Sequence, residues 1–199
     1  MESNGKSVTL TGERVDYAKK ALLHADAAIR LDDGSEAWAH GVVPGDVGTF
    51  RVSREGKRIF ATLERLSAPS VDRVQAPCPW VDRCGGCPWM VARPELAKEA
   101  KLAAVARAVG GAVAVEWHPS PSSVAYRRRA RFAFARTTKG VELGYRAPRS
   151  RSVVDVDGCV ILDAPLADAL PSIREALAAA VGTGEARVAL GAGGRPVLF

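Results

Sequence analysis

The chain has 199 residues, enough for one medium domain or two small ones, and its 47% hydrophobic and 25% charged residues are ordinary values for a globular protein. The net charge is +6; the N-terminus is polar rather than a signal sequence, and no apolar run could span a bilayer. We therefore expect a cytoplasmic monomer without membrane contact, in which reduced cysteines bind a metal centre rather than form disulfides.

The first 66 residues are predicted to form about five short strands separated by turns. Asp33-Gly34 and Pro44-Gly45 are two of the turn signals. The alanine-rich segment Tyr17–Ala28 could also be helical. Five strands in some sixty residues predict a small all-β barrel of the OB type. The strand-like runs are 7–11, 27–31, 36–40, 47–52 and 58–63.

Residues 67–77 hold two prolines and no helical period, so a linker is predicted there, followed by an α+β domain over 78–199. Its predicted helices are 95–109, opened by Pro94 and stopped by two glycines, and 164–181, interrupted by Pro171. Its predicted strands are 126–134, 141–145, 153–156, 186–190 and 196–199.

Two features of the C-terminal stretch carry further expectations. The glycines at 191–194 indicate a hairpin turn rather than a cofactor loop, because no helix follows them to meet a ligand. The chain also ends within an apolar strand, and a domain seldom ends on such an unprotected edge. We therefore expect a domain that is truncated here, with more protein beyond Phe199.

Four cysteines carry the most specific pattern, C-x5-C-x2-C-x71-C, formed by Cys78, Cys84, Cys87 and Cys159. Four thiolates are what one iron–sulfur cluster or one structural zinc needs. A curled loop with three ligands and a distant fourth favours a cubane cluster, since zinc ribbons more often pair two C-x2-C knuckles. Zinc stays open as an alternative, as does a redox pair of Cys84 and Cys87.

A basic stretch between residues 126 and 151 carries nine basic side chains and one acid, Glu142, so the rest of the chain is slightly acidic. Concentrated positive charge favours a polyanion, chiefly nucleic acid, although a solvated face without a ligand gives the same pattern. The candidate RNA-binding residues are Arg127, Arg128, Arg129, Arg131, Arg136, Arg146, Arg149 and Arg151.

Several of these motifs together resemble the bacterial 23S ribosomal RNA (uracil-5-)-methyltransferases. Val42–Asp46, reading Val-Val-Pro-Gly-Asp before a predicted strand, resembles the TRAM domain, an RNA-binding OB-like module. The segments Cys78–Trp89, Tyr126–Phe132 and Val154–Cys159 resemble the central domain of those enzymes. The similarity covers nearly the whole chain, and the spacing and order of the cysteines make it specific.

The resemblance implies a TRAM domain over 1–66 that grips RNA and an incomplete central domain over 78–199 whose four cysteines hold a 4Fe–4S cluster. It also implies a C-terminal S-adenosylmethionine domain that performs methyl transfer to carbon 5 of a uridine. The cofactor loop, catalytic cysteine and catalytic glutamate of that domain have no counterparts here, so no residue is assigned a catalytic role. We expect the chain alone to be inactive and to recognise ribosomal RNA. The alternative is a stand-alone RNA-binding iron–sulfur or zinc adaptor without catalysis.

Overall fold

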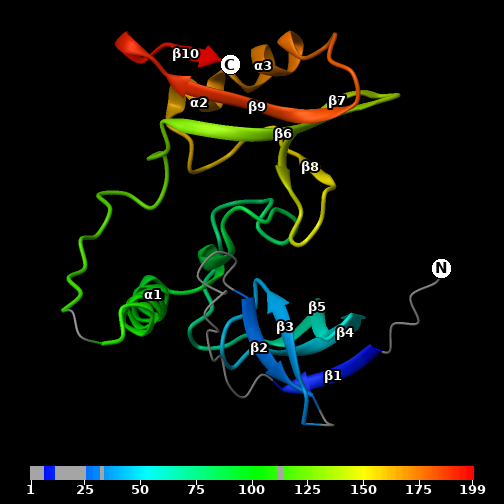
Figure 1. Cartoon of the computed structure of the whole chain (residues 1–199), viewed down its shortest axis with the longest axis vertical. Helices are drawn as coiled ribbons and strands as arrows, with labels where there is room; N and C mark the ends of the chain where they lie inside the picture. The colour runs from blue at the N-terminus through cyan, green and yellow to red at the C-terminus, as the bar shows by residue number, and fades with distance from the viewer. Residues whose placement is uncertain (1–6, 12–25, 32–33, 112–113) are drawn as a thin grey trace. The chain divides into compact units, whose positions relative to one another are not determined.

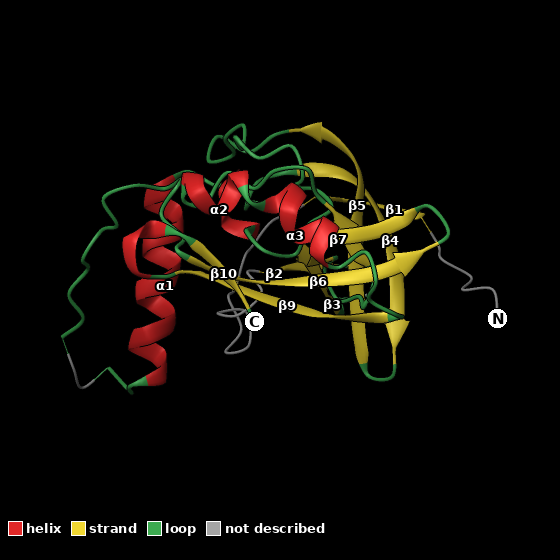
Figure 2. Cartoon of the chain, turned by 90° about the horizontal axis from the view of Figure 1, so that it is seen from above, coloured by secondary structure: helices red, strands yellow, loops and turns green. Residues whose placement is uncertain are grey.

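The computed structural model describes residues 7–11, 26–31, 34–111 and 114–199 (Figure 1). Strands make up most of its regular structure and helices are few (Figure 2), which confirms the predicted predominance of β structure. Among the described residues, no helix combines the length and apolar character needed to cross a membrane.

The chain divides into two compact units, each built around one five-stranded sheet. The first unit comprises Met1–Ala76 and Cys87–Trp117, and the second comprises Pro77–Gly86 and His118–Phe199. The segment Pro77–Gly86, which carries Cys78 and Cys84, therefore belongs with the C-terminal part of the chain.

The strands of the first unit lie where the sequence predicts them, and two extend further. Of the alanine-rich segment that could have been helical, residues 17–25 lie outside the described residues and the remainder is strand. The sheet order is β1-β4-β5-β3-β2, with β3 and β5 parallel and the other pairs antiparallel. The strands are β1 (Ser7–Thr11), β2 (Asp26–Arg30), β3 (Glu36–His40), β4 (Val47–Glu55) and β5 (Arg58–Ala68).

Alternation of side chains along these strands builds one apolar core. Ala37 and Ala39 of β3 are fully buried, as is Phe50 of β4, and Ile59 and Ala61 of β5 lie in the same cluster. Successive strand residues face opposite sides of a sheet, so β2, β3 and β5 each give the core every second residue. The sheet is held as a unit by this shared core as well as by its ladders.

A buried carboxylate fastens the segment that follows β5. Asp46 is 0% exposed, and its two oxygens accept hydrogen bonds from the backbone N–H of Val43 at 2.7 Å and of Ser70 at 2.9 Å. The guanidinium of Arg73 donates to the same carboxylate at 2.7–3.0 Å and also to the Gly41 carbonyl at 2.7 Å. Part of the segment read as a linker is thus pinned to the turn before β4.

The predicted helix after the cysteine loop is confirmed as α1 (Pro94–Ala108). Pro94 occupies its first turn, where a missing N–H breaks no helical hydrogen bond. The alanines at 97, 100 and 104 form its buried stripe. Gly110 and Gly111 follow with φ of +71° and +70°, a left-handed conformation that suits glycine and ends the helix.

The second unit carries a sheet in the order β10-β9-β6-β7-β8, antiparallel throughout. The predicted hairpin at 191–194 is confirmed, since β9 and β10 pair on either side of it. The strands are β6 (Arg129–Thr137), β7 (Gly140–Arg146), β8 (Val153–Asp155), β9 (Thr183–Leu190) and β10 (Pro196–Leu198).

Strand β6 begins three residues later than predicted. The residues just before it pair instead with the segment after Cys159: the N–H groups of Tyr126 and Arg127 both donate to the Ile161 carbonyl, at 3.1 and 2.8 Å. This pairing is long-range in sequence, so the local alternation of residues 126–134 could not reveal it. Its effect is to hold the start of the basic stretch beside the segment that carries Cys159.

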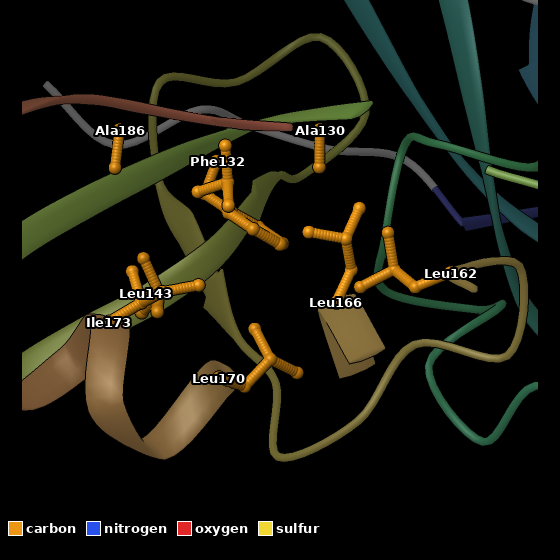
Figure 3. Packing of buried hydrophobic residues seen from close by; sticks show 9 residues of the cluster. Ala130, Phe132, Leu143, Leu162, Leu166, Leu170, Ile173 and Ala186 are labelled. Carbon is orange, nitrogen blue, oxygen red and sulfur yellow. The ribbon is translucent and has the colours of Figure 1, made fainter. Parts of the chain in front are cut away.

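Two short helices cover one face of this sheet (Figure 3). Leu166 of α2 (Ala164–Asp168) and Leu170 and Ile173 of α3 (Leu170–Ala176) pack against Phe132 of β6 and other core residues. Pro171 breaks the predicted helix as expected, although α3 ends five residues before the predicted limit.

An arginine of α3 ties the helix to two strands. The Arg174 side chain donates to the carbonyls of Val141 and Val156 and to the carboxylate of Asp155 at 2.7 Å. Asp155 in turn accepts the Leu143 N–H at 2.9 Å. These bonds span up to 33 residues of sequence and fix the end of β8, from which the chain leads to Cys159.

Candidate metal centre and nucleic-acid interface

Tight turns shape the first part of the cysteine loop. The N–H groups of Val81 and Cys84 donate to the carbonyls of Cys78 and Trp80, at 3.4 and 2.7 Å. The Gly85 N–H donates to the Arg146 carbonyl at 3.0 Å. A Cβ at Gly85 would lie 3.0 Å from that oxygen, so glycine is what allows the loop to approach the end of β7 so closely.

Three of the four cysteines lie near one another in the second unit. Cys78, Cys84 and Cys159 are all half-buried, and Cys159 packs against the core cluster of this unit. The Cys84 sulfur accepts the Gly86 N–H at 3.4 Å. Burial raises the pKa of the Cys84 thiol, and the charges of Cys159 and Cys78 raise it further, against the lowering effect of that hydrogen bond.

Cys87 belongs to the first unit, where it precedes a short 3-10 helix and its carbonyl accepts the Met90 N–H at 3.0 Å. All four cysteines are free of disulfides. Among the described residues, no three His, Cys, Asp or Glu side chains are arranged as a preformed metal site. The predicted four-thiolate centre therefore stays a prediction.

Tyr145 places a buried hydroxyl beside two of the thiols. Burial raises the pKa of Tyr145, and its neighbours Cys159 and, more weakly, Cys84 raise it further, while Arg127 lowers it. The Tyr145 hydroxyl is buried, and its interaction with the Cys159 sulfur contributes to the raised pKa. Its ring packs on Phe132, with centroids 5.3 Å apart, so this tyrosine belongs to the core of the second unit.

All eight arginines of the predicted RNA-binding set are exposed. Two of them make partial contacts within the protein: Arg128 lies 3.6 Å from Asp163, and Arg136 donates to the Ala178 carbonyl at 2.8 Å. Exposed ion pairs of this kind contribute little to stability. The exposed guanidinium groups of Arg128 and Arg136 therefore keep donors that can reach an external anion.

One basic residue outside the predicted RNA-binding set lies beside Arg131. Arg187 of β9 is exposed and pairs directly across the sheet with Arg131 of β6. Alternation over residues 186–190 already indicated an outward Arg187. Its position opposite Arg131 depends on the register between two strands some fifty residues apart, which local patterns do not reveal.

Comparison with known proteins gives consistent matches, although no protein-family model matches the chain. Proteins named 23S rRNA (uracil(1939)-C(5))-methyltransferase RlmD are 35% identical over 153 residues in Pectobacterium atrosepticum and 33% over 160 in Dichelobacter nodosus. The matches cover 73% and 74% of this chain but 34% and 36% of the relatives. The chain thus spans about a third of the length of these proteins.

A solved structure shares the fold. The tRNA (uracil-54, C5)-methyltransferase of Pyrococcus abyssi, in complex with S-adenosyl-L-homocysteine, aligns with a TM-score of 0.58 at 23% sequence identity. The alignment covers 88% of this chain and 45% of the archaeal one.

Proposed function

The chain is homologous to part of the bacterial 23S rRNA (uracil-C5)-methyltransferases, and from this we propose that it is the RNA-recognition and 4Fe–4S-binding portion of such an enzyme. The whole protein would transfer a methyl group from S-adenosylmethionine to carbon 5 of a uridine in ribosomal RNA. Its proposed setting is the cytoplasm, where thiols stay reduced. We propose a monomer.

We assign no residue of this chain to the methyl-transfer step. Methylation of uracil at carbon 5 needs a thiolate that adds to carbon 6 and a base that removes the carbon-5 proton. The chain has four cysteines, and all of them have another proposed role as cluster ligands. Its contribution is to bind and orient the RNA.

The first sheet is the proposed TRAM domain. Supporting this are its five strands, the mixed order β1-β4-β5-β3-β2 and the position of the Val42–Asp46 motif at the turn before β4. Strands β1 and β2 lie at the two edges of the order, so a pairing between them would close the sheet into a small barrel. Asp46 of that motif is the buried carboxylate that organises the turn.

The proposed cluster ligands are Cys78, Cys84, Cys87 and Cys159. The fit rests on the proximity of three thiols in the second unit and on the buried Tyr145 hydroxyl, a donor that interacts with the Cys159 sulfur. Hydrogen bonds to the sulfur atoms are one of the ways in which a protein tunes a bound iron–sulfur cluster, and this hydroxyl is placed to donate one. When bound, the cluster would supply a cross-link between the loop and the segment after β8.

The exposed arginines are the proposed contacts to RNA phosphates, and one triple variant tests this. Replacing Arg127, Arg128 and Arg129 with alanine should flatten the dependence of log K on log salt by about 2, because each lost phosphate contact to a single strand removes about 0.7. The measurement is RNA affinity, by fluorescence anisotropy, across a salt series.

A control variant removes the same charge elsewhere. Lys98, Arg107 and Arg195 are exposed basic residues outside the 126–151 stretch, and alanine at all three should leave the salt slope nearly unchanged. If the two triple variants lower the slope equally, the effect comes from net charge and the assigned contacts are wrong.

A further inference from the structure

Three arginines gather on one face of the second sheet. In the β6–β9 ladder Arg131 lies directly opposite Arg187, while Arg129 lies opposite Ala189. Arg129 and Arg131 are two residues apart on one strand, so they share a face and stand about 7 Å apart. Residues directly opposite have Cβ atoms about 5 Å apart. The three side chains therefore start close enough to converge on one or two phosphate groups.

This arrangement costs stability in the free protein. Like charges directly opposite on neighbouring strands destabilise a sheet. Glu185 partly offsets the repulsion, with its carboxylate 3.7 Å from the Arg131 guanidinium, but the two side chains are 42% and 64% exposed. Such an exposed pair is worth little, and one acid does not balance three bases. A bound anion would remove the remaining repulsion.

The three arginines have no role in packing the hydrophobic core, which lies on the opposite face of the sheet. The opposite face of the same strands carries Ala130, Phe132, Ala186 and Val188, which pack against the two helices (Figure 3). The arginine face is exposed, as its side chains show. Arginine is also the side chain whose planar fork matches phosphate oxygens two at a time.

A hollow with an aromatic side chain lies at this face. The hollow has a volume of about 360 Å³, and its lining includes the three arginines and Phe199. Phe199 is 75% exposed, while its backbone N–H donates to the Arg187 carbonyl at 2.8 Å and so holds the residue beside β9. An exposed ring next to cationic groups is the combination that binds unpaired bases together with their phosphates.

We propose that this face of the second sheet, formed by Arg129, Arg131, Arg187 and Phe199, binds single-stranded RNA, with the arginines on backbone phosphates and the Phe199 ring stacked on a base. The proposal rests on the RNA-binding function above and adds a site to it. Arg187 and Phe199 lie outside the basic stretch that the sequence singles out.

The test uses the full chain and a fluorescein-labelled single-stranded RNA of about 16 nucleotides, a length within known site sizes. Arg187→Ala should lower the slope of log K against log salt by about 0.7, because one phosphate contact is lost. Arg187→Lys should keep this slope because it keeps the charge, but it should weaken binding because lysine lacks the planar fork of the guanidinium group. Phe199→Ala should weaken binding at least about fivefold without changing the slope. Arg195→Ala, an exposed arginine in the adjoining turn, is the matched control and should leave both quantities unchanged.

The outcomes separate this inference from the function it rests on. If wild-type protein binds RNA and the 127–129 triple variant lowers the slope but Arg187→Ala does not, this site is wrong and the proposed function stands. Unaltered affinity in Phe199→Ala would remove the stacking contact. Tighter binding of a duplex than of the single strand would overturn the single-strand assignment. If the wild-type chain binds no RNA at all, both proposals fail.

The Arg187→Ala substitution removes the repulsion between Arg187 and Arg131, so the unfolding midpoint of this variant should not fall below that of the wild type.

Discussion

Replacing Asp46 with asparagine should destabilise the first unit by about 3–5 kcal/mol, the usual cost of breaking a buried ion pair by removing one partner. Asparagine keeps the size of the side chain but not its charge. The Arg73 guanidinium, only 14% exposed, would then keep its charge without the carboxylate that balances it. One amide nitrogen would also face the N–H groups of Val43 or Ser70, which need an acceptor.

Local readouts and a surface control make this prediction specific. Hydrogen exchange at the amides of β4 and β5 reports opening of the first unit separately from the second. Glu64→Gln is the control, because its ion pair with Arg51 spans 3.1 Å between side chains that are 37% and 60% exposed, and should change stability by no more than about 1 kcal/mol. Equal protection in the two variants would show that the Asp46 network does not hold this unit together.

Replacing Cys84 with serine should give colourless protein whose second unit is cleaved rapidly by protease. Binding free energy of a metal centre is folding free energy when the ligands do not come together without it. Here the loop carrying Cys78 and Cys84 is shaped by hydrogen bonds within its own turns, and its Gly85 N–H donates to the Arg146 carbonyl at the end of β7. Limited proteolysis followed by mass spectrometry would locate the cleavage sites within the loop and the 147–163 segment.

A neighbouring substitution controls for disturbance of the loop. Asp82 is exposed in the same turn and has no proposed ligand role, so Asp82→Asn should stay coloured and resistant. A Cys84→Ser protein that is brown and as resistant as Asp82→Asn would exclude Cys84 as a structural ligand.

Local sequence signals predicted the elements well wherever the determining interactions are themselves local. In β6 the order of residue types matches the burial pattern, with Arg129 and Arg131 exposed and Ala130 and Phe132 buried. Pro171 likewise predicted the break between α2 and α3. In both cases the residues that determine the structure lie within a few positions of it.

The features that the sequence did not reveal depend on contacts between distant residues. The partner of Asp46 lies 27 residues away, in a segment whose prolines indicated only a linker. The Arg131–Arg187 pair depends on strand register, and the later start of β6 depends on pairing with the segment after Cys159. Local periodicity does not determine strand register or the partner of a strand, because both depend on tertiary packing.

The metal centre is the claim on which the rest of this account depends, since the cysteines would fix the loop and the strands that present the arginines. Anaerobic purification of the wild-type chain followed by iron, sulfide and zinc analysis tests it most directly. The account predicts brown protein with about four iron and four sulfide ions per chain and little zinc. Soluble, compact protein with stoichiometric zinc, or with no metal and no sulfide, would contradict it.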